Sequence, residues 1–134
     1  MKRPIMAVLA IGFLAVSIPA LAHHSFTNFW NLDQTSNITG VVKSLRLVNP
    51  HCELVVTVTD DNGVETDWYV TSRGTGSAIM RAGWTADTLP IGMTVTVEGS
   101  PPRRRGSPAI VAGKITRSDG SEVWFGGGGG IPQG

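Results

Sequence analysis

The residues with the clearest capacity for chemistry in this chain are its three histidines, His23, His24 and His51. The sequence Ala20-Leu21-Ala22 ends in the small-x-small pattern that signal peptidase cuts, so cleavage there would make His23 the first residue of the mature chain. An amino-terminal histidine can chelate one metal ion through its free α-amine and its ring nitrogen together. We therefore expect His23, with His51 and also His24, to form a nitrogen-rich metal site.

Such a site favours copper(II), with zinc or nickel next, because imidazole and amine ligands suit these ions and the affinity series peaks at copper. Glu53 shares the His51 face of a predicted strand, so it is a candidate further ligand or an acceptor for the imidazole N–H. Cys52 points to the other face, where we expect a small core residue rather than a thiolate ligand. The alternative is structural: His23 and His24 form a solvated chain end, and His51 satisfies backbone groups at a strand start.

The polar residues near the histidines form no recognisable catalytic constellation. Ser25 is adjacent to His24 and Asp33 is close in sequence, but sequence neighbours are rarely a nucleophile and base poised in space, and no nucleophile-elbow pattern occurs. Gly74-Thr75-Gly76-Ser77 precedes a predicted helix but lacks the lysine and spacing of a phosphate loop. We predict no catalytic residue. Enzymatic activity would require redox chemistry at a copper site with open coordination positions.

The first 22 residues have the layout of a secretory signal peptide. Lys2 and Arg3 give a positive start, residues 5–18 are almost entirely apolar, and Pro19 precedes the Ala20-Leu21-Ala22 site. An uncleaved anchor is the rival interpretation, because the apolar stretch approaches the length of about 18 residues expected of a transmembrane helix. Pro19 and the cleavage site favour removal after Ala22. We expect a periplasmic protein with no membrane attachment once the signal is cleaved.

Size, charge and cysteine content narrow the class of the mature domain. Removing 22 of the 134 residues leaves 112, the size of a single domain. Removing Lys2 and Arg3 from the eleven basic residues leaves nine basic against ten acidic residues. The mature domain therefore lacks the overall basic charge typical of nucleic-acid-binding proteins. Cys52 is the only cysteine in the sequence, so no intramolecular disulfide can form and stability must come from a packed core.

The elements that must position these residues are predominantly β-strands. Residues 51–59 alternate apolar and polar side chains with period two, and Asp60-Asp61-Asn62-Gly63 then supplies the turn of a hairpin. Val42 is out of phase with Leu45, which predicts a β-bulge near Lys43-Ser44. The predicted strands are residues 39–48, 51–59, 66–71, 93–99 and 109–117, with a short apolar end at 123–125.

A short helix is predicted at residues 77–82, with Ser77 as the capping residue and Gly83 as the stop. This order predicts a mainly β fold: a small OB-like barrel of five to six strands, with one short helix between strands three and four, rather than a sandwich of about seven strands. We divide the chain into a signal peptide (1–22), the OB-like barrel (23–125) and a flexible glycine-rich tail (126–134).

An OB-like barrel also suggests a second function, that of a non-catalytic binding module for an envelope glycan or protein partner. Aromatic side chains provide stacking surfaces in such modules, and the residues 103–105 add three consecutive arginines between the fourth and fifth strands. The export signal and the near-neutral mature charge argue against nucleic acid as the ligand. The candidate aromatic residues are Trp30, Trp68, Tyr69, Trp84 and Trp124.

Several short motifs together resemble a family of small exported bacterial proteins of unknown function. The motifs are His23-His24-Ser25-Phe26 after Ala22, Thr39-Gly40-Val41-Val42, Asn49-Pro50-His51, Arg81-Ala82-Gly83-Trp84 and Thr94 to Gly99. The resemblance covers nearly the whole mature chain and implies an OB-type β-barrel. It implies no activity, substrate or cofactor; it marks the His-His-Ser-Phe and Asn-Pro-His segments as signature positions, and Cys52 is not among them.

Overall fold

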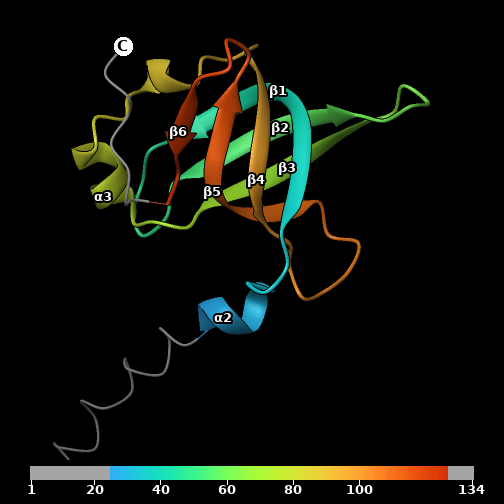
Figure 1. Cartoon of the computed structure of the whole chain (residues 1–134), viewed down its shortest axis with the longest axis horizontal. Helices are drawn as coiled ribbons and strands as arrows, with labels where there is room; N and C mark the ends of the chain where they lie inside the picture. The colour runs from blue at the N-terminus through green and yellow to red at the C-terminus, as the bar shows by residue number, and fades with distance from the viewer. Residues whose placement is uncertain (1–24, 127–134) are drawn as a thin grey trace, which may run out of the picture.

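The computed structural model describes residues 25–126, which form a closed β-barrel with short helices around it: α3 lies beside the barrel and α2 lies below it in the view of Figure 1. The predicted signal peptide, His23, His24 and the tail beyond residue 126 lie outside the described residues. In chain order the elements are α2 (Ser25–Phe29), β1 (Ser36–Arg46), β2 (Glu53–Thr59), β3 (Glu65–Ser72), α3 (Gly76–Arg81), the 3-10 helix η2 (Ala86–Thr88), β4 (Thr94–Ser100), β5 (Ala109–Arg117) and β6 (Glu122–Trp124).

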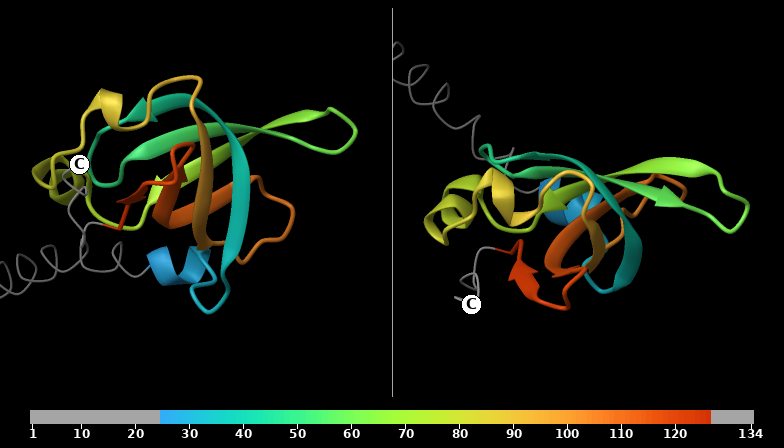
Figure 2. Two further views of the ribbon diagram at one scale, coloured as in Figure 1. Left: turned by 45° about the horizontal axis from the view of Figure 1, so that its top comes forward. Right: turned by 90° about the horizontal axis from the view of Figure 1, so that it is seen from above.

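The strands form one sheet in the order β3-β2-β1-β4-β5-β6. The five longer strands close into a barrel because β3 also pairs with β5 in parallel, with Tyr69 opposite Ala109 and Ser72 opposite Ala112. β6 adds a short sixth strand on the outer side of β5. Figure 2 shows α3 and η2 at the opposite end of the barrel from the β2–β3 turn. The predicted OB-like barrel, with its helix between the third and fourth strands, is confirmed.

β1 is the strand on which the closure depends, since it pairs with β2 along one part and with β4 along another. Val42 lies opposite Val56, but the next pair is Ser44 with Val55, so Lys43 is an extra residue and forms a bulge. A bulge increases the local twist and bends the strand. The predicted bulge is therefore confirmed, although β1 begins at Ser36, three residues before the predicted start.

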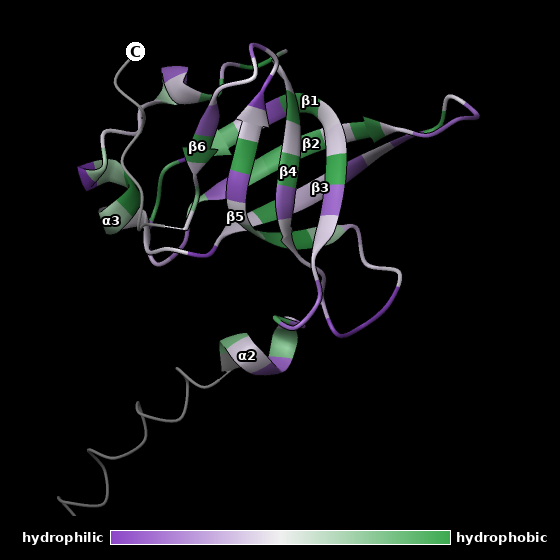
Figure 3. Ribbon diagram, viewed as in Figure 1, coloured by the Kyte–Doolittle hydropathy of each residue, from purple (hydrophilic) through white to green (hydrophobic). Residues whose placement is uncertain are grey.

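The barrel interior is filled by the apolar side of each strand, as the alternating colours of Figure 3 show. Leu54, Val56 and Val70 are fully or almost fully buried on β2 and β3, while Thr59 and Tyr69 on the same strands are exposed. Cys52 is completely buried in this core, as predicted. The strand pattern thus assigns the faces of the barrel correctly because side chains alternate between its two surfaces.

The cap of α3 differs from the sequence prediction. Thr75 is the N-cap, and its side-chain oxygen accepts a hydrogen bond of 3.3 Å from the backbone N–H of Ala78. Ser77 lies inside the first turn, where its own N–H donates to the Asn49 side chain at 2.8 Å, so its predicted capping role is wrong. The predicted stop is confirmed, since Gly83 follows the helix with a φ of 96°. Within residues 25–126, no helix has the length and apolar character needed to cross a membrane.

Gly40 provides a test of the close strand packing in the barrel. A Cβ atom at Gly40 would overlap the backbone carbonyl oxygen of Thr57, whereas a Cβ at Gly113 on β5 would meet nothing within 4 Å. We expect Gly40→Ala to lower the free energy of unfolding by about 1–3 kcal/mol, and Gly113→Ala to change it by less than about 0.5 kcal/mol. Urea unfolding followed by circular dichroism measures both, and equal stability of the two variants would contradict this account of the packing.

Candidate functional site

The Asn49-Pro50-His51 segment lies in the loop between β1 and β2 and packs against the start of α3. The Pro50 carbonyl accepts a hydrogen bond from the Gly76 N–H at 3.0 Å, and the Asn49 side-chain oxygen accepts one from the Ser77 N–H at 2.8 Å. Two helix N–H groups that lack partners within the helix are thereby satisfied. The peptide bond between Asn49 and Pro50 is cis. The loop and the helix start therefore form one hydrogen-bonded unit.

Close backbone packing at Gly76 holds this unit together. Gly76 is buried, and a Cβ atom there would overlap the backbone carbonyl oxygen of Val48. Only glycine therefore allows the β1–β2 loop to approach the helix start so closely. The segment Gly74-Thr75-Gly76-Ser77, which lacks the lysine and spacing of a phosphate loop, contacts the Asn49-Pro50-His51 segment.

The ring of His51 is fixed by two backbone carbonyl groups. Its Nδ1 atom lies 2.9 Å from the Ser72 carbonyl oxygen and 3.1 Å from the Gly74 carbonyl oxygen. Carbonyl oxygens only accept hydrogen bonds, so Nδ1 must carry the proton and donate to both. In the neutral ring, the Nε2 atom then holds the lone pair. The geometry thus presents Nε2 of His51 as an available metal ligand or proton acceptor.

Ser72 organises the polar contacts under the histidine. Its hydroxyl accepts from the Cys52 N–H at 2.8 Å and donates to the Gly74 carbonyl at 2.7 Å, and its own N–H donates to the Cys52 carbonyl at 3.0 Å. The side chain is completely buried. The hydrogen bond from the buried Ser72 hydroxyl therefore fixes the position of the Gly74 carbonyl, which in turn accepts a hydrogen bond from His51.

Phe26 covers the outer side of the His51 ring. The two rings are stacked, with centroids 5.3 Å apart and an interplanar angle of 21°. Phe26 belongs to α2, whose following residue Trp30 is buried and pairs with Pro102 in a short β-bridge. Arg103 strengthens this attachment, because its backbone N–H donates to the Phe29 carbonyl at 2.9 Å and its side-chain Nε donates to the Thr27 carbonyl at 3.1 Å. α2 is thus held between the β4–β5 loop and His51.

The remaining predicted ligand, Glu53, and the predicted core residue Cys52 lie in different surroundings. Glu53 is exposed, and one of its carboxylate oxygens accepts a hydrogen bond from Arg46 at 2.6 Å. Cys52 is buried in the core, where burial raises the pKa of its thiol. Among residues 25–126, no three His, Cys, Asp or Glu side chains gather as a metal-binding group. His23 and His24 are outside the described residues.

Three site residues received no role from the sequence. Ser72 and Gly74 lie 21 and 23 residues after His51 in the sequence. The local sequence pattern around Ser72 does not indicate that this residue, at the end of β3, contacts a histidine in the β1–β2 loop. Phe26 had a signal, since it belongs to the His-His-Ser-Phe segment, but the pattern does not indicate which ring it would cover. Its contact with His51 is a consequence of how α2 attaches to the barrel.

The aromatic residues suggested for a binding face are distributed over the whole molecule. Trp30 and Trp84 are buried, and Trp84 stacks on Phe125 with ring centroids 4.9 Å apart, so both have structural roles. Tyr69 and Trp124 are exposed on separate strands, β3 and β6. Trp68 is half-buried and lines a cavity described below. No single surface therefore combines all five aromatic candidates.

Asn49 supports the helix start, so its removal has a defined cost. We expect Asn49→Ala to lower the free energy of unfolding by about 1 kcal/mol, because the Ser77 N–H loses its acceptor. The matched control is Asn62→Ala in the β2–β3 turn, where the side chain is exposed and the change should lie within about 0.5 kcal/mol. Urea unfolding measures both. A variant at Asn49 that is as stable as the control would mean that the side chain does not cap α3.

The buried Cys52 thiol should be unreactive in the folded protein. Complete burial blocks access, and the raised pKa keeps the sulfur protonated near neutral pH. We expect a thiol reagent that reports by absorbance to label no cysteine in the native chain and one in concentrated guanidinium chloride. Rapid labelling of the native protein would show that Cys52 is accessible and belongs to a reactive site rather than to the core.

Comparison with known proteins identifies the family of the chain. No curated protein matches the chain. A family model described as "Family of unknown function (DUF6152)" matches residues 11–110, which includes β1 to β4, the β1–β2 loop with its histidine and the β4–β5 loop. Because this match extends over most of the sequence, the chain belongs to that family of unknown function.

Proposed function

We propose that this protein is exported, is cleaved after Ala22, and binds one transition-metal ion, copper(II) in preference to zinc, through His23 and His51. The observation that carries the proposal is the state of the His51 ring. Its Nδ1 atom is committed to the Ser72 and Gly74 carbonyls, and its ring is stacked on Phe26, three residues after His23.

The hydrogen bonds of His51 match those of a metal-binding histidine. Metal-ligating imidazoles commonly donate their second ring N–H to a backbone carbonyl or carboxylate, which fixes the tautomer and the ring orientation. In His51 both carbonyl contacts go to Nδ1, at 2.9 and 3.1 Å. Each contact alone requires the proton to be on Nδ1, so the two contacts specify the same tautomer. This arrangement supports Nε2 as the ligand atom.

Covalent geometry supports a contribution from His23. An extended chain spans at most about 3.6 Å per residue, so the Cα atom of His23 must lie within about 11 Å of the Cα atom of Phe26. The Phe26 ring itself lies on His51, at a centroid distance of 5.3 Å. An α-amine and an imidazole on one residue form a chelate, and two nitrogen ligands from His23 with one from His51 favour copper(II) in this proposal.

His24 and Glu53 take secondary roles in this proposal. His24 is one residue closer to Phe26 and supplies a fourth nitrogen ligand. Glu53 would have to release Arg46, with which it forms an ion pair at 2.6 Å, before it could coordinate a metal. We therefore expect the contribution of Glu53 to be small compared with that of His51.

Native mass spectrometry of protein recovered from a bacterial periplasm, with copper or zinc supplied, tests both parts of the proposal. We expect a chain that begins at His23 and carries one copper ion. His51→Gln should lower copper affinity by about tenfold or more, because the glutamine amide can still donate to the two carbonyls but offers no ring nitrogen to the metal. Glu53→Gln is the comparison variant and should lose much less copper affinity than His51→Gln.

A second variant separates the amine from the rest of the site. Insertion of Ser-Ser-Gly-Ser before His23, at the cleavage junction, keeps every histidine but moves His23 and His24 to the fifth and sixth positions, where neither ring can chelate together with the α-amine, and it should weaken copper binding as His51→Gln does. Circular dichroism confirms that each variant is folded. A correctly processed wild-type chain that holds no metal under either loading, or a His51→Gln variant that binds copper like the wild type, would rule out the proposed site.

A further inference from the structure

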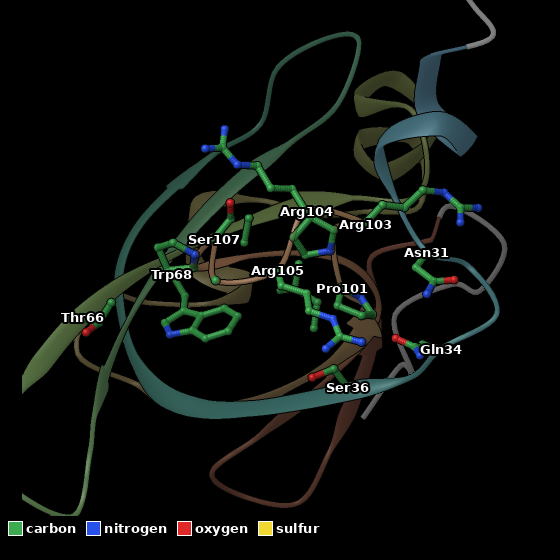
Figure 4. Close-up of a pocket in the computed structure, with 15 residues that line it drawn as sticks. Asn31, Gln34, Ser36, Thr66, Trp68, Pro101, Arg103, Arg104, Arg105 and Ser107 are labelled. Carbon is green, nitrogen blue, oxygen red and sulfur yellow. The ribbon is translucent and has the colours of Figure 1, made fainter.

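A cavity of about 650 Å³ lies beside the β4–β5 loop, on the core-facing side of β3, and His51 is not among its lining residues (Figure 4). Its size is in the range of sites that hold a small organic ligand. Fifteen residues line it, from segment 31–36, strand β3, the β4–β5 loop and the first two residues of β5. They are Asn31, Gln34, Ser36, Thr66, Trp68 and the continuous segment from Pro101 to Ile110.

The charged side chains that line the cavity are all positive. Arg103, Arg104 and Arg105 all contribute to its lining, and none of the fifteen lining residues is acidic. Within the described part of the chain, the ion pairs use other basic residues, namely Lys43, Arg46 and Lys114. An anion in the cavity would therefore meet positive charge that no neighbouring carboxylate neutralises.

The three arginines have different orientations. In Figure 4 the side chain of Arg105 points along the cavity toward Ser36 and Gln34, whereas Arg103 and Arg104 extend from the loop to either side. Arg103 already donates to the Thr27 carbonyl at 3.1 Å. Arg105 is consequently the guanidinium best placed to form a paired hydrogen bond with a carboxylate or phosphate inside the cavity.

The rest of the lining suits a ligand with a flat apolar face and several hydroxyl groups. The indole ring of Trp68 forms one wall and is half-buried against the barrel core. The hydrogen-bonding side chains around it are amides and hydroxyls, from Asn31, Gln34, Ser36, Thr66 and Ser107. Sugar rings use these two kinds of contact together, since their C–H faces stack on tryptophan while their hydroxyls bind amides and hydroxyls.

From this combination we infer that the cavity binds an acidic saccharide, with a sugar ring on Trp68 and its anionic group on Arg105. The inference is independent of the proposed metal site, with which it shares no ligand residue. The loop that carries Arg105 is anchored at both ends, because the Tyr69 N–H donates to the Pro108 carbonyl at 2.9 Å and the Asn31 N–H donates to the Pro101 carbonyl at 2.9 Å. Such anchoring lowers the entropic cost of binding.

Isothermal titration of the purified chain with trigalacturonate, an acidic trisaccharide, tests the inference. We expect binding that weakens by about tenfold or more in Arg105→Gln, because the carboxylate loses its guanidinium partner. The neutral α-1,4-linked galactotriose should bind at least about tenfold more weakly than trigalacturonate to the wild type. Trp68→Ala should also weaken binding, and Trp68→Phe, which keeps an aromatic ring on the core-facing side of β3, should restore part of it.

The matched control is Arg81→Gln, which removes the same charge from the exposed end of α3, outside the cavity lining. It should leave the affinity for trigalacturonate unchanged. No binding of trigalacturonate to the wild type, equal losses in Arg105→Gln and Arg81→Gln, or equally tight binding of the neutral trisaccharide would each overturn the inference. Adenosine monophosphate is titrated in parallel, and a nucleotide that binds more tightly than the saccharide would also overturn it.

Discussion

The structure depends on the double pairing of β1, which must form antiparallel pairs with two different strands. Its amino-terminal half pairs with β4 and its carboxyl-terminal half with β2. A regular strand could not curve enough to do both within eleven residues, and the bulge at Lys43 supplies the bend. Gly40 adds to this constraint, because the backbone of Thr57 occupies the space where a side chain would project. Closure of the barrel by β3 and β5 follows from this curvature.

Closure also determines where the candidate metal ligand is placed. The parallel pairing of β3 with β5 ends at Ser72, and the chain then turns toward α3. The carbonyls of Ser72 and Gly74 at this turn are the acceptors for the His51 ring. The β1–β2 loop reaches them because Gly76 allows a close backbone approach and Asn49 completes the helix start. The orientation of His51 is thus a property of the barrel end, produced by contacts from three separate segments.

The parts of this architecture that the sequence predicted are those with a repeated local pattern. Period-two alternation located the strands and even the bulge, because the phase change between Val42 and Leu45 is visible in the sequence. The prediction failed at Ser77, because the helix is capped by Thr75 and the Ser77 N–H instead donates to Asn49, 28 residues earlier in the chain. For the same reason the pattern identified His51 but not Ser72, its buried neighbour. A hydrogen bond between distant segments leaves no periodic signal.

α2 shows most clearly why the site cannot be inferred from motifs alone. A helix of five residues is far too short to be stable in isolation, so its position must come from tertiary contacts. One end of it covers His51 through Phe26, and the other is tied to the β4–β5 loop, where Arg103 reaches Thr27 across 76 residues of sequence. Arg105, two residues further along this loop, lines the second cavity. The loop that holds α2 in place therefore also carries a charged side chain of the cavity, and contacts between segments far apart in the sequence decide how His51 and Arg105 are presented.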